Sequence, residues 1–187
     1  MNDKIVSIFP TAVMLVDMSN HSLKSKTLEI IENTELTDHS LLENGVSSFA
    51  SESILDHPEL IDLKKDITNS IKKYTSVGGY SPLKLGNSWF NQMRNGGAVI
   101  PHRHEGSVLS GAYYIKAPEG SSNLYFSSPL KPYRMNDIFS TETPFNEYQH
   151  CIPCYEDLMV LFPSWLEHYT DKNENDTRTV ISFNTTR

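Results

Sequence analysis

Hydrophobic residues recur at helical spacing between Ser51 and Tyr74, where the chain has its clearest helical pattern. This spacing places apolar side chains on one face and lysines on the other, as in a helix packed on a larger body. Pro58 favours a helix start close to it, and Gly78-Gly79 predicts the helix end. The apolar face consists of Ile54, Leu55, Leu60, Leu63, Ile67 and Ile71.

Two weaker patterns precede this helix. Residues 5–16 are mostly apolar and predict a strand, or a pair of strands broken at Pro10. Residues 23–42 mix helical spacing with polar positions. Three histidines of the helical N-terminal part have no clustered partners, so we expect them on the surface: His21, His39 and His57.

After the helix, short alternating or continuously apolar segments predict strands. Residues 158–162 form an unbroken apolar run, which is typical of a buried strand. Eight strands separated by turn signals favour a mainly β fold, a jelly roll with helices on one outer face. The predicted strands are 83–85, 88–93, 99–102, 108–116, 123–126, 148–152, 158–162 and 179–184.

The long segment 127–147 interrupts these strands without any periodicity and is rich in Pro, Tyr and Phe. Loops of this length are often lids or binding loops, although a surface excursion held by its own aromatic residues is an equal alternative. Cys151 and Cys154 follow, and we interpret them as two reduced thiols rather than a redox pair or half of a zinc site.

The length of 187 residues suits one domain, with 1–85 as strand and helices packed on a β core formed by 86–187. A net charge of −7 disfavours general nucleic-acid binding. The chain has no apolar run long enough for a membrane span, and its start lacks the pattern of a signal peptide, so we expect a cytoplasmic protein. The oligomeric state stays open, with a homodimer among the options.

Three histidines carry the candidate chemistry. His102 ends a predicted strand and His104 follows it after one residue, and side chains at i and i+2 of a strand share a face. His168 follows the buried strand at 158–162. Neutral imidazoles bind iron, zinc, copper or nickel. A single histidine in such a place is more often a solvent-exposed or hydrogen-bonding residue, but the three together predict a mononuclear metal site.

Arg178 opens the last predicted strand. If Ile181 and Phe183 pack in an outer core, strand alternation turns Arg178 and Ser182 toward the barrel interior. A buried guanidinium needs an anionic partner, and a planar carboxylate matches its geometry. The alternative is a solvated surface charge. The face shared with Arg178 consists of Val180, Ser182 and Asn184.

These segments resemble the Fe(II)- and 2-oxoglutarate-dependent oxygenases, and more narrowly a small group common in phages and marine bacteria. The resemblance runs from Asn87 to Asn184 and depends on the order and spacing of its motifs, whereas residues 1–85 match more loosely. The motifs are Trp89-Phe-Asn91, His102-Arg-His104, Ser110-Gly-Ala-Tyr-Tyr114, Phe162-Pro-Ser-Trp-Leu-Glu-His168 and Arg178-Thr-Val-Ile-Ser-Phe-Asn184.

The resemblance implies a double-stranded β-helix, similar to that of the prolyl hydroxylases, with Fe(II) near one mouth. It implies that His102 and His168 occupy the two histidine positions of the metal site, and that Arg178 binds the distal carboxylate of 2-oxoglutarate with help from Tyr114. Ser182 is a further candidate on the cosubstrate side. Asn91 and Trp165 are candidates on the substrate side, although a tryptophan is more commonly a core residue.

The third ligand position departs from the wider superfamily, which has His-x-Asp or His-x-Glu there. This chain has His104 at that position, followed by Glu105. We favour ligation by His104, which gives a three-histidine site. The alternatives are Glu105 reaching the metal through a local kink, or a water molecule with His104 behind it.

The predicted function is that of a dioxygenase, a hydroxylase that couples oxidative decarboxylation of 2-oxoglutarate to oxidation of a small-molecule or peptidyl substrate. Two alternatives belong to other classes. A jelly roll does not dictate function, so a cupin-like metal-binding or sugar-binding module is one of them. The other is a structural phage protein with a vestigial site. An arginine beside the metal is required only by the oxygenase.

Overall fold

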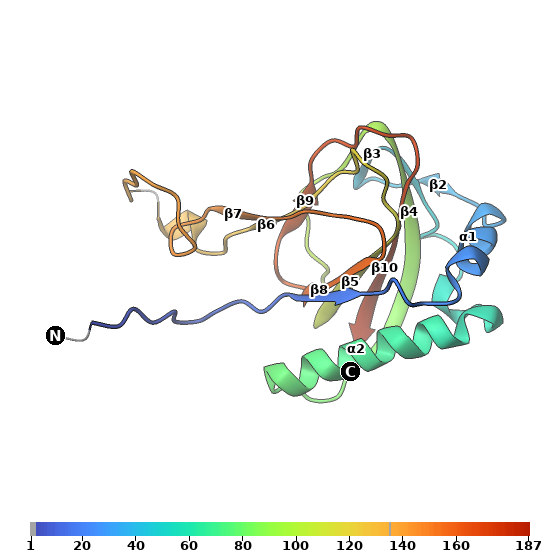
Figure 1. Ribbon diagram of the computed structural model, residues 1–187, viewed down its shortest axis with the longest axis horizontal. Helices are drawn as coiled ribbons and strands as arrows, with labels where there is room; N and C mark the ends of the chain where they lie inside the picture. The colour runs from blue at the N-terminus through green and yellow to red at the C-terminus, as the bar shows by residue number, and fades with distance from the viewer. Residues whose placement is uncertain (1–2, 135) are drawn as a thin grey trace.

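The structure, a computed structural model, describes residues 3–134 and 136–187 as two antiparallel sheets with helices on one side (Figure 1). The larger sheet has the strand order β1-β8-β5-β10-β4-β3-β2, and the smaller has the order β7-β6-β9. The strands of the larger sheet are β1 Met14–Asp17, β8 Leu158–Pro163, β5 Leu109–Lys116, β10 Arg178–Thr186, β4 Lys84–Val99, β3 Leu42–Ser47 and β2 Thr37–Asp38; those of the smaller are β7 Gln149–Ile152, β6 Leu124–Ser127 and β9 His168–Thr170.

The helices lie against the outer face of the larger sheet. Helix α2 (Ile61–Gly78) follows two short 3-10 turns, η1 (Ile54–Asp56) and η2 (Pro58–Leu60), and α1 (Lys24–Glu32) lies near its start (Figure 1). The helix end is confirmed: Gly79 takes the left-handed conformation, with φ 68°, that favours glycine. The predicted start was too early, because the chain forms tight turns around Pro58 before the α-helix begins.

Both faces of the larger sheet are buried at its central strands β8 and β5, which explains the continuous apolar run of β8. On β10, Ile181 and Phe183 pack with α2 in the outer core, whereas Val180 packs in the inner core between the two sheets. The same division occurs on β8, where Leu161 faces outward and Phe162 inward. The mainly β, jelly-roll prediction and the predicted alternation of the last strand are therefore confirmed.

Gly111, in the middle of β5, makes room for a ring of the neighbouring strand. A Cβ atom at this position would lie 2.2 Å from Cζ of Phe183. Real atoms do not approach so closely, so the close packing of Phe183 on β5 requires glycine here.

Several strand predictions were wrong in their bounds. Residues 84–85, 88–93 and 99 belong to the single long strand β4, and residues 100–102 do not continue it except for one isolated bridge at His102. Strands β2, β3 and β9 were not predicted. Within 5–16, only the last residues enter a strand, β1.

The prediction that His21 lies on the surface was also wrong, because its side chain is only 5% exposed and bonds Asp66.

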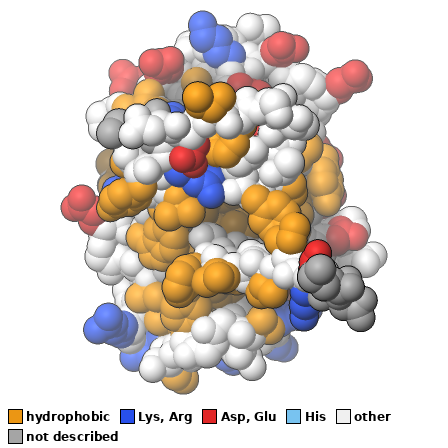
Figure 2. Space-filling model, turned by 90° about the vertical axis from the view of Figure 1, so that its left-hand side faces the viewer, with side chains coloured by type: hydrophobic (Ala, Val, Ile, Leu, Met, Phe, Trp, Pro, Cys, Tyr) orange, Lys and Arg blue, Asp and Glu red, His pale blue; other side chains and the backbone are white. Residues whose placement is uncertain are grey.

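Two segments extend from the same side of the molecule, opposite to α1 (Figure 1). One is the N-terminal segment before β1, and the other is the loop between β6 and β7, which contains the short turn η3 (Lys131–Tyr133). Figure 2 faces this side and shows hydrophobic side chains gathered over it. The exposed apolar residues of the two segments are Ile5, Val6, Ile8, Phe9, Leu130, Tyr133, Ile138, Phe139 and Phe145.

Two further observations concern the residues that the structure describes. Cys151, on β7, and Cys154, just beyond it, are free thiols. No helix within 3–134 or 136–187 is long and apolar enough to cross a membrane.

Candidate active site

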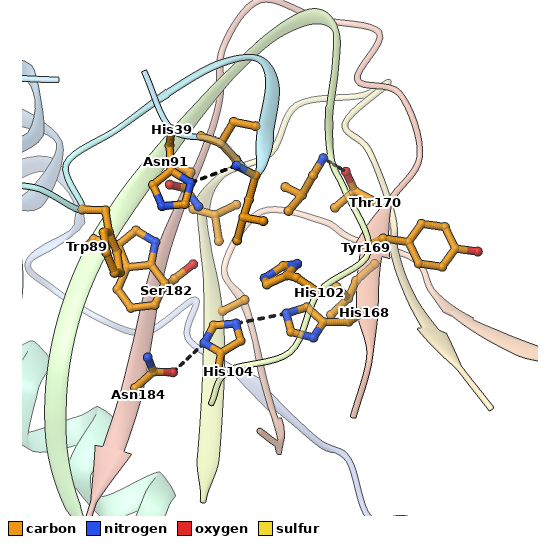
Figure 3. Close-up of a pocket in the computed structure, with 18 of the residues that line it drawn as sticks. His39, Trp89, Asn91, His102, His104, His168, Tyr169, Thr170, Ser182 and Asn184 are labelled. Atoms are coloured by element: carbon orange, nitrogen blue, oxygen red, sulfur yellow. Dashed lines mark hydrogen bonds between the residues drawn. The ribbon is translucent and has the colours of Figure 1, made fainter. Parts of the chain in front are cut away.

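Three imidazoles converge at one end of the space between the sheets (Figure 3). His102, His104 and His168 each offer a ring nitrogen, and these nitrogens all lie within 4.8 Å of one another. The structure therefore brings together the three histidines that the sequence singled out.

Backbone hydrogen bonds, rather than a regular strand, hold the histidines in place. The N–H of His102 donates to the carbonyl of His168, and the N–H of His168 donates back to the carbonyl of His102, both at 3.0 Å. The N–H of His104 donates to the carbonyl of Ser164 at 3.0 Å. The predicted strand geometry for His102 and His104 was wrong, but both side chains still turn to the same point.

The hydrogen bonds of the rings determine which nitrogen is free. In each ring Nδ1 lies next to a carbonyl-type oxygen: the backbone oxygen of Ile100 at 2.9 Å, that of Leu166 at 3.0 Å, and Oδ1 of Asn184 at 2.6 Å. Such an oxygen accepts but cannot donate, so Nδ1 carries the proton in all three rings. The lone pair of Nε2 is left free in each ring, which is the form that binds a metal.

Burial keeps these rings neutral. It lowers the pKa of His168 to about 3 and that of His104 to about 4, and it also lowers the pKa of His102. A buried ring avoids the charged form because the low-dielectric surroundings solvate it poorly. All three rings are therefore neutral at physiological pH.

Glu105 lines the same cavity but does not belong to the histidine cluster. Its side chain is exposed, and its carboxylate is not among the grouped metal-ligating atoms. A local kink that would bring it to the histidines does not occur in this structure.

Arg178 lies deeper in the same cavity and is only 2% exposed. Its guanidinium carbon lies 5.1 Å from the centre of the Tyr114 ring. Its Nε is buried without a hydrogen-bond partner, and in the described part of the chain no carboxylate lies within ion-pair distance of it. Burial raises the pKa of Tyr114 well above its usual range, so its hydroxyl stays protonated.

The histidines and Arg178 line one cavity of about 260 Å³. Ser182 and Asn91 line it too, as Figure 3 shows. Trp165 does not: its side chain is 51% exposed, and it is neither a core residue nor part of the cavity wall. No described residue of the loop 127–147 lines the cavity either.

Four residues of the cavity wall were missed because β2 and β3 were missed: His39, Leu41, Leu42 and Phe49. His39, predicted to be a surface residue, lines the cavity, and its ring contacts Phe49 edge to face at 5.1 Å. Phe49 in turn contacts Trp89 at 5.0 Å. The pair Asn44-Gly45 could have indicated this part of the sheet, because it forms an irregularity in β3 where Asn44 has a positive φ of 47°.

Comparisons with solved structures show the same fold at low sequence identity. HygX from Streptomyces hygroscopicus, solved with nickel and 2-oxoglutarate bound, has a TM-score of 0.66 at 10% identity over 94% of this chain and 83% of its own. A Pseudomonas putida prolyl-4-hydroxylase has a TM-score of 0.62 at 10% identity over 95% and 94%. A Trichoplax adhaerens prolyl hydroxylase has a TM-score of 0.63 at 11% identity over 92% and 82%.

A search of curated proteins finds no match to the sequence. A family model described as "Putative 2OG-Fe(II) oxygenase" matches residues 87–184, which are more than half of the chain. This range contains the three histidines, Arg178 and the strands that hold them. The chain belongs to the family of 2-oxoglutarate- and Fe(II)-dependent oxygenases.

Proposed function

We propose that this protein is a 2-oxoglutarate-dependent hydroxylase with a three-histidine iron site. In this proposal His102, His104 and His168 bind Fe(II) through Nε2. Arg178 binds the distal carboxylate of 2-oxoglutarate, with Tyr114 and Ser182 beside it. The proposed substrate is a small molecule or a peptidyl side chain that enters past Asn91.

The buried guanidinium of Arg178, which has an unbonded Nε and no carboxylate partner among the described residues, carries the cosubstrate part of this proposal. A permanent positive charge that is buried without a carboxylate partner is costly, so a fold keeps it when a ligand supplies the anion. The guanidinium lies in the same cavity as the histidines. A dicarboxylate is the kind of ligand that would satisfy a metal and an arginine at once.

The chemistry of the histidines supports iron. Three neutral imidazoles with free Nε2 atoms form a donor set that suits a first-row divalent ion. The Nε2 atoms of His104 and His168 lie 3.2 Å apart, a separation that adjacent ligands of one ion adopt when each bond is about 2.1 Å. Three ligands also leave positions open for a cosubstrate.

Iron bound there supplies the redox chemistry by which O₂ and 2-oxoglutarate yield succinate and CO₂ while a substrate C–H bond becomes C–OH. The protein supplies orientation and a dry cavity. Arg178 and Tyr114 hold the cosubstrate at one end, with the protonated hydroxyl of Tyr114 available as a donor. Phe162 and Val180 line the cavity with apolar surface, which excludes water from the reacting groups.

The test combines binding with turnover. Anaerobic addition of Fe(II) and 2-oxoglutarate should produce a visible charge-transfer band, and admission of O₂ should convert 2-oxoglutarate to succinate even without substrate. His102→Ala should show neither. Absence of both signals from the wild type would refute the proposal and favour a metal module without oxidative chemistry.

A further inference from the structure

Among the three histidines, only His104 has its Nδ1 bonded to another side chain. His102 and His168 each donate to a backbone oxygen two residues earlier in the chain, so their orientation is built into the local backbone. His104 donates instead to Oδ1 of Asn184, near the end of β10, at 2.6 Å. The orientation of this ring therefore depends on a residue from a distant part of the sequence.

The amide of Asn184 is itself oriented by buried hydroxyls. Ser110, the partner of Asn184 across the β5–β10 ladder, donates its hydroxyl to the same Oδ1 at 2.8 Å. The hydroxyl of Ser110 also lies 2.8 Å from that of Ser164, and both serines are fully buried. Oδ1 of Asn184 thus accepts both the hydroxyl of Ser110 and the Nδ1–H of His104, and the NH₂ group of Asn184 points away from His104.

Ser164 links this network to the backbone of His104 as well. Its carbonyl accepts the N–H of His104, and its hydroxyl bonds the Ser110 hydroxyl that lies behind the His104 ring. Ser164 therefore contacts both the backbone of His104 and the hydrogen-bonded serines that orient Asn184. The ring of Trp89 stacks on His104 with the centres 5.9 Å apart and the planes 26° apart. This stacking limits tilting of the ring, but only the bond to Asn184 distinguishes the two ring nitrogens.

The geometry points to Asn184 as the positioning residue that makes His104 present Nε2, and not Nδ1, to the metal. This inference rests on the proposed iron site. It also gives a physical reason for histidine at the third ligand position. A histidine has one nitrogen for the metal and an N–H for Asn184, whereas an ionised carboxylate has no proton to donate to Oδ1.

The inference is tested with metals alone, without turnover. Co(II) titrations followed by visible absorption measure affinity and report changes in the ligand set. Asn184→Ala removes the acceptor and should weaken Co(II) binding by about 10–100-fold, as losses of such outer partners typically do. Asn184→Asp keeps an acceptor oxygen and should bind Co(II) nearly as well as the wild type.

Two further variants separate positioning from a general structural role. Asn123→Ala is a matched control, because Asn123 is also part-buried but bonds Asp171 and the backbone of Cys154, away from the cavity wall. It should leave Co(II) affinity unchanged. Asn184→Leu removes the acceptor while nearly preserving the side-chain volume. It replaces Asn184→Ala in the Co(II) titration if the alanine variant does not fold.

A direct readout is long-range proton–nitrogen NMR of the imidazoles in Zn(II)-loaded protein. In the wild type all three rings should show a metal-bound Nε2 and a protonated Nδ1. In Asn184→Ala the ring of His104 should lose this single pattern, while those of His102 and His168 keep it. A double-mutant cycle gives the same information, because Asn184→Ala should have little further effect on Co(II) affinity once His104→Ala has removed the ring.

The outcomes are distinguishable. If the wild type binds neither Co(II) nor Zn(II), the proposed function itself fails. If the wild type binds them and Asn184→Ala or Asn184→Leu binds equally well with an unchanged His104 pattern, Asn184 is not the positioning residue. Equal losses in the alanine and aspartate variants would likewise overturn the role of the acceptor oxygen.

Discussion

Nε2 of His104 and Nε2 of His168 lie 3.2 Å apart, and neither carries a proton in the tautomers that their Nδ1 bonds require. Two lone pairs at this separation repel each other unless a cation lies against both. Because burial disfavours protonation of either ring, a bound metal is the cation that this arrangement accommodates.

Removal of a histidine should therefore remove the metal. His102→Ala and His168→Ala should each lose stoichiometric Fe(II), because each deletes one of three ligands. Metal analysis after anaerobic loading and desalting measures this directly. His150→Ala is a suitable control, since His150 is exposed and bonds only Glu147. Full iron retention by either of the first two variants would contradict the assignment.

The third ligand can be identified by a pair of neighbouring substitutions. His104→Ala should weaken Mn(II) or Fe(II) binding strongly, whereas Glu105→Ala should leave it near the wild-type value, because the Glu105 side chain is exposed and outside the cluster. Calorimetric titration of both variants gives the comparison. The reverse pattern would show that Glu105 moves to the metal when it binds.

The faces of strand β10 were predictable from the sequence because its side chains alternate between two buried cores. Its alternation places Ile181 and Phe183 in the outer core, and Arg178 and Ser182 at the cavity, as the pattern alone required. The periodicity of two residues is a local property, so no knowledge of the neighbouring strands was needed to assign the faces.

The rest of the site depends on contacts between distant parts of the chain. The predicted reason for the convergence of His102 and His104 was strand alternation, but the actual cause is the bridge to His168 and the bond to Ser164. His39 reaches the cavity only because β3 pairs with β4. Local hydrophobicity gives no signal for such pairings, since half-polar strands resemble loops in sequence.

The close contact at Gly111 gives a stability prediction. Gly111→Ala should lower the free energy of unfolding by about 1–3 kcal/mol, because a Cβ there clashes with the ring of Phe183. Urea unfolding of the metal-free protein measures the change. In a Phe183→Leu background, where the ring is absent, the same substitution should cost clearly less. Additive effects of the two changes would mean that the ring is not the source of the cost.

The buried histidines predict how stability depends on pH. Their pKa values, about 4 for His104 and about 3 for His168, lie below the ordinary 6.5, so the unfolded chain binds these protons first as the pH falls. The metal-free protein should thus lose stability from about pH 6.5 downward, by on the order of 2–4 kcal/mol at pH 5 relative to pH 7.5.

Urea unfolding in the presence of a chelator, at pH 5 and at pH 7.5, measures this difference. Above pH 5 the carboxylates contribute little, because their ordinary pKa values lie near 4. A variant with His104→Gln and His168→Gln should show a flatter pH dependence than the wild type. An equal dependence in both proteins would show that other groups cause it.

The cosubstrate site gives the last prediction. Arg178→Ala should leave the metal bound but weaken 2-oxoglutarate binding severely, because the distal carboxylate would stay in the cavity without its partner. Loss of one member of a buried charge pair costs on the order of 3–5 kcal/mol, or about two to four decades in affinity. Arg178→Lys should recover only part of this affinity, since an ammonium group cannot make the two parallel hydrogen bonds of a guanidinium.

Calorimetric titration of Mn(II)-loaded protein with 2-oxoglutarate avoids turnover and measures the affinity. Arg94→Ala is the matched control, because Arg94 is exposed on β4 and outside the cavity wall. Equal affinity of the wild type and Arg178→Ala would mean that the buried guanidinium serves the fold alone and that the carboxylate binds elsewhere.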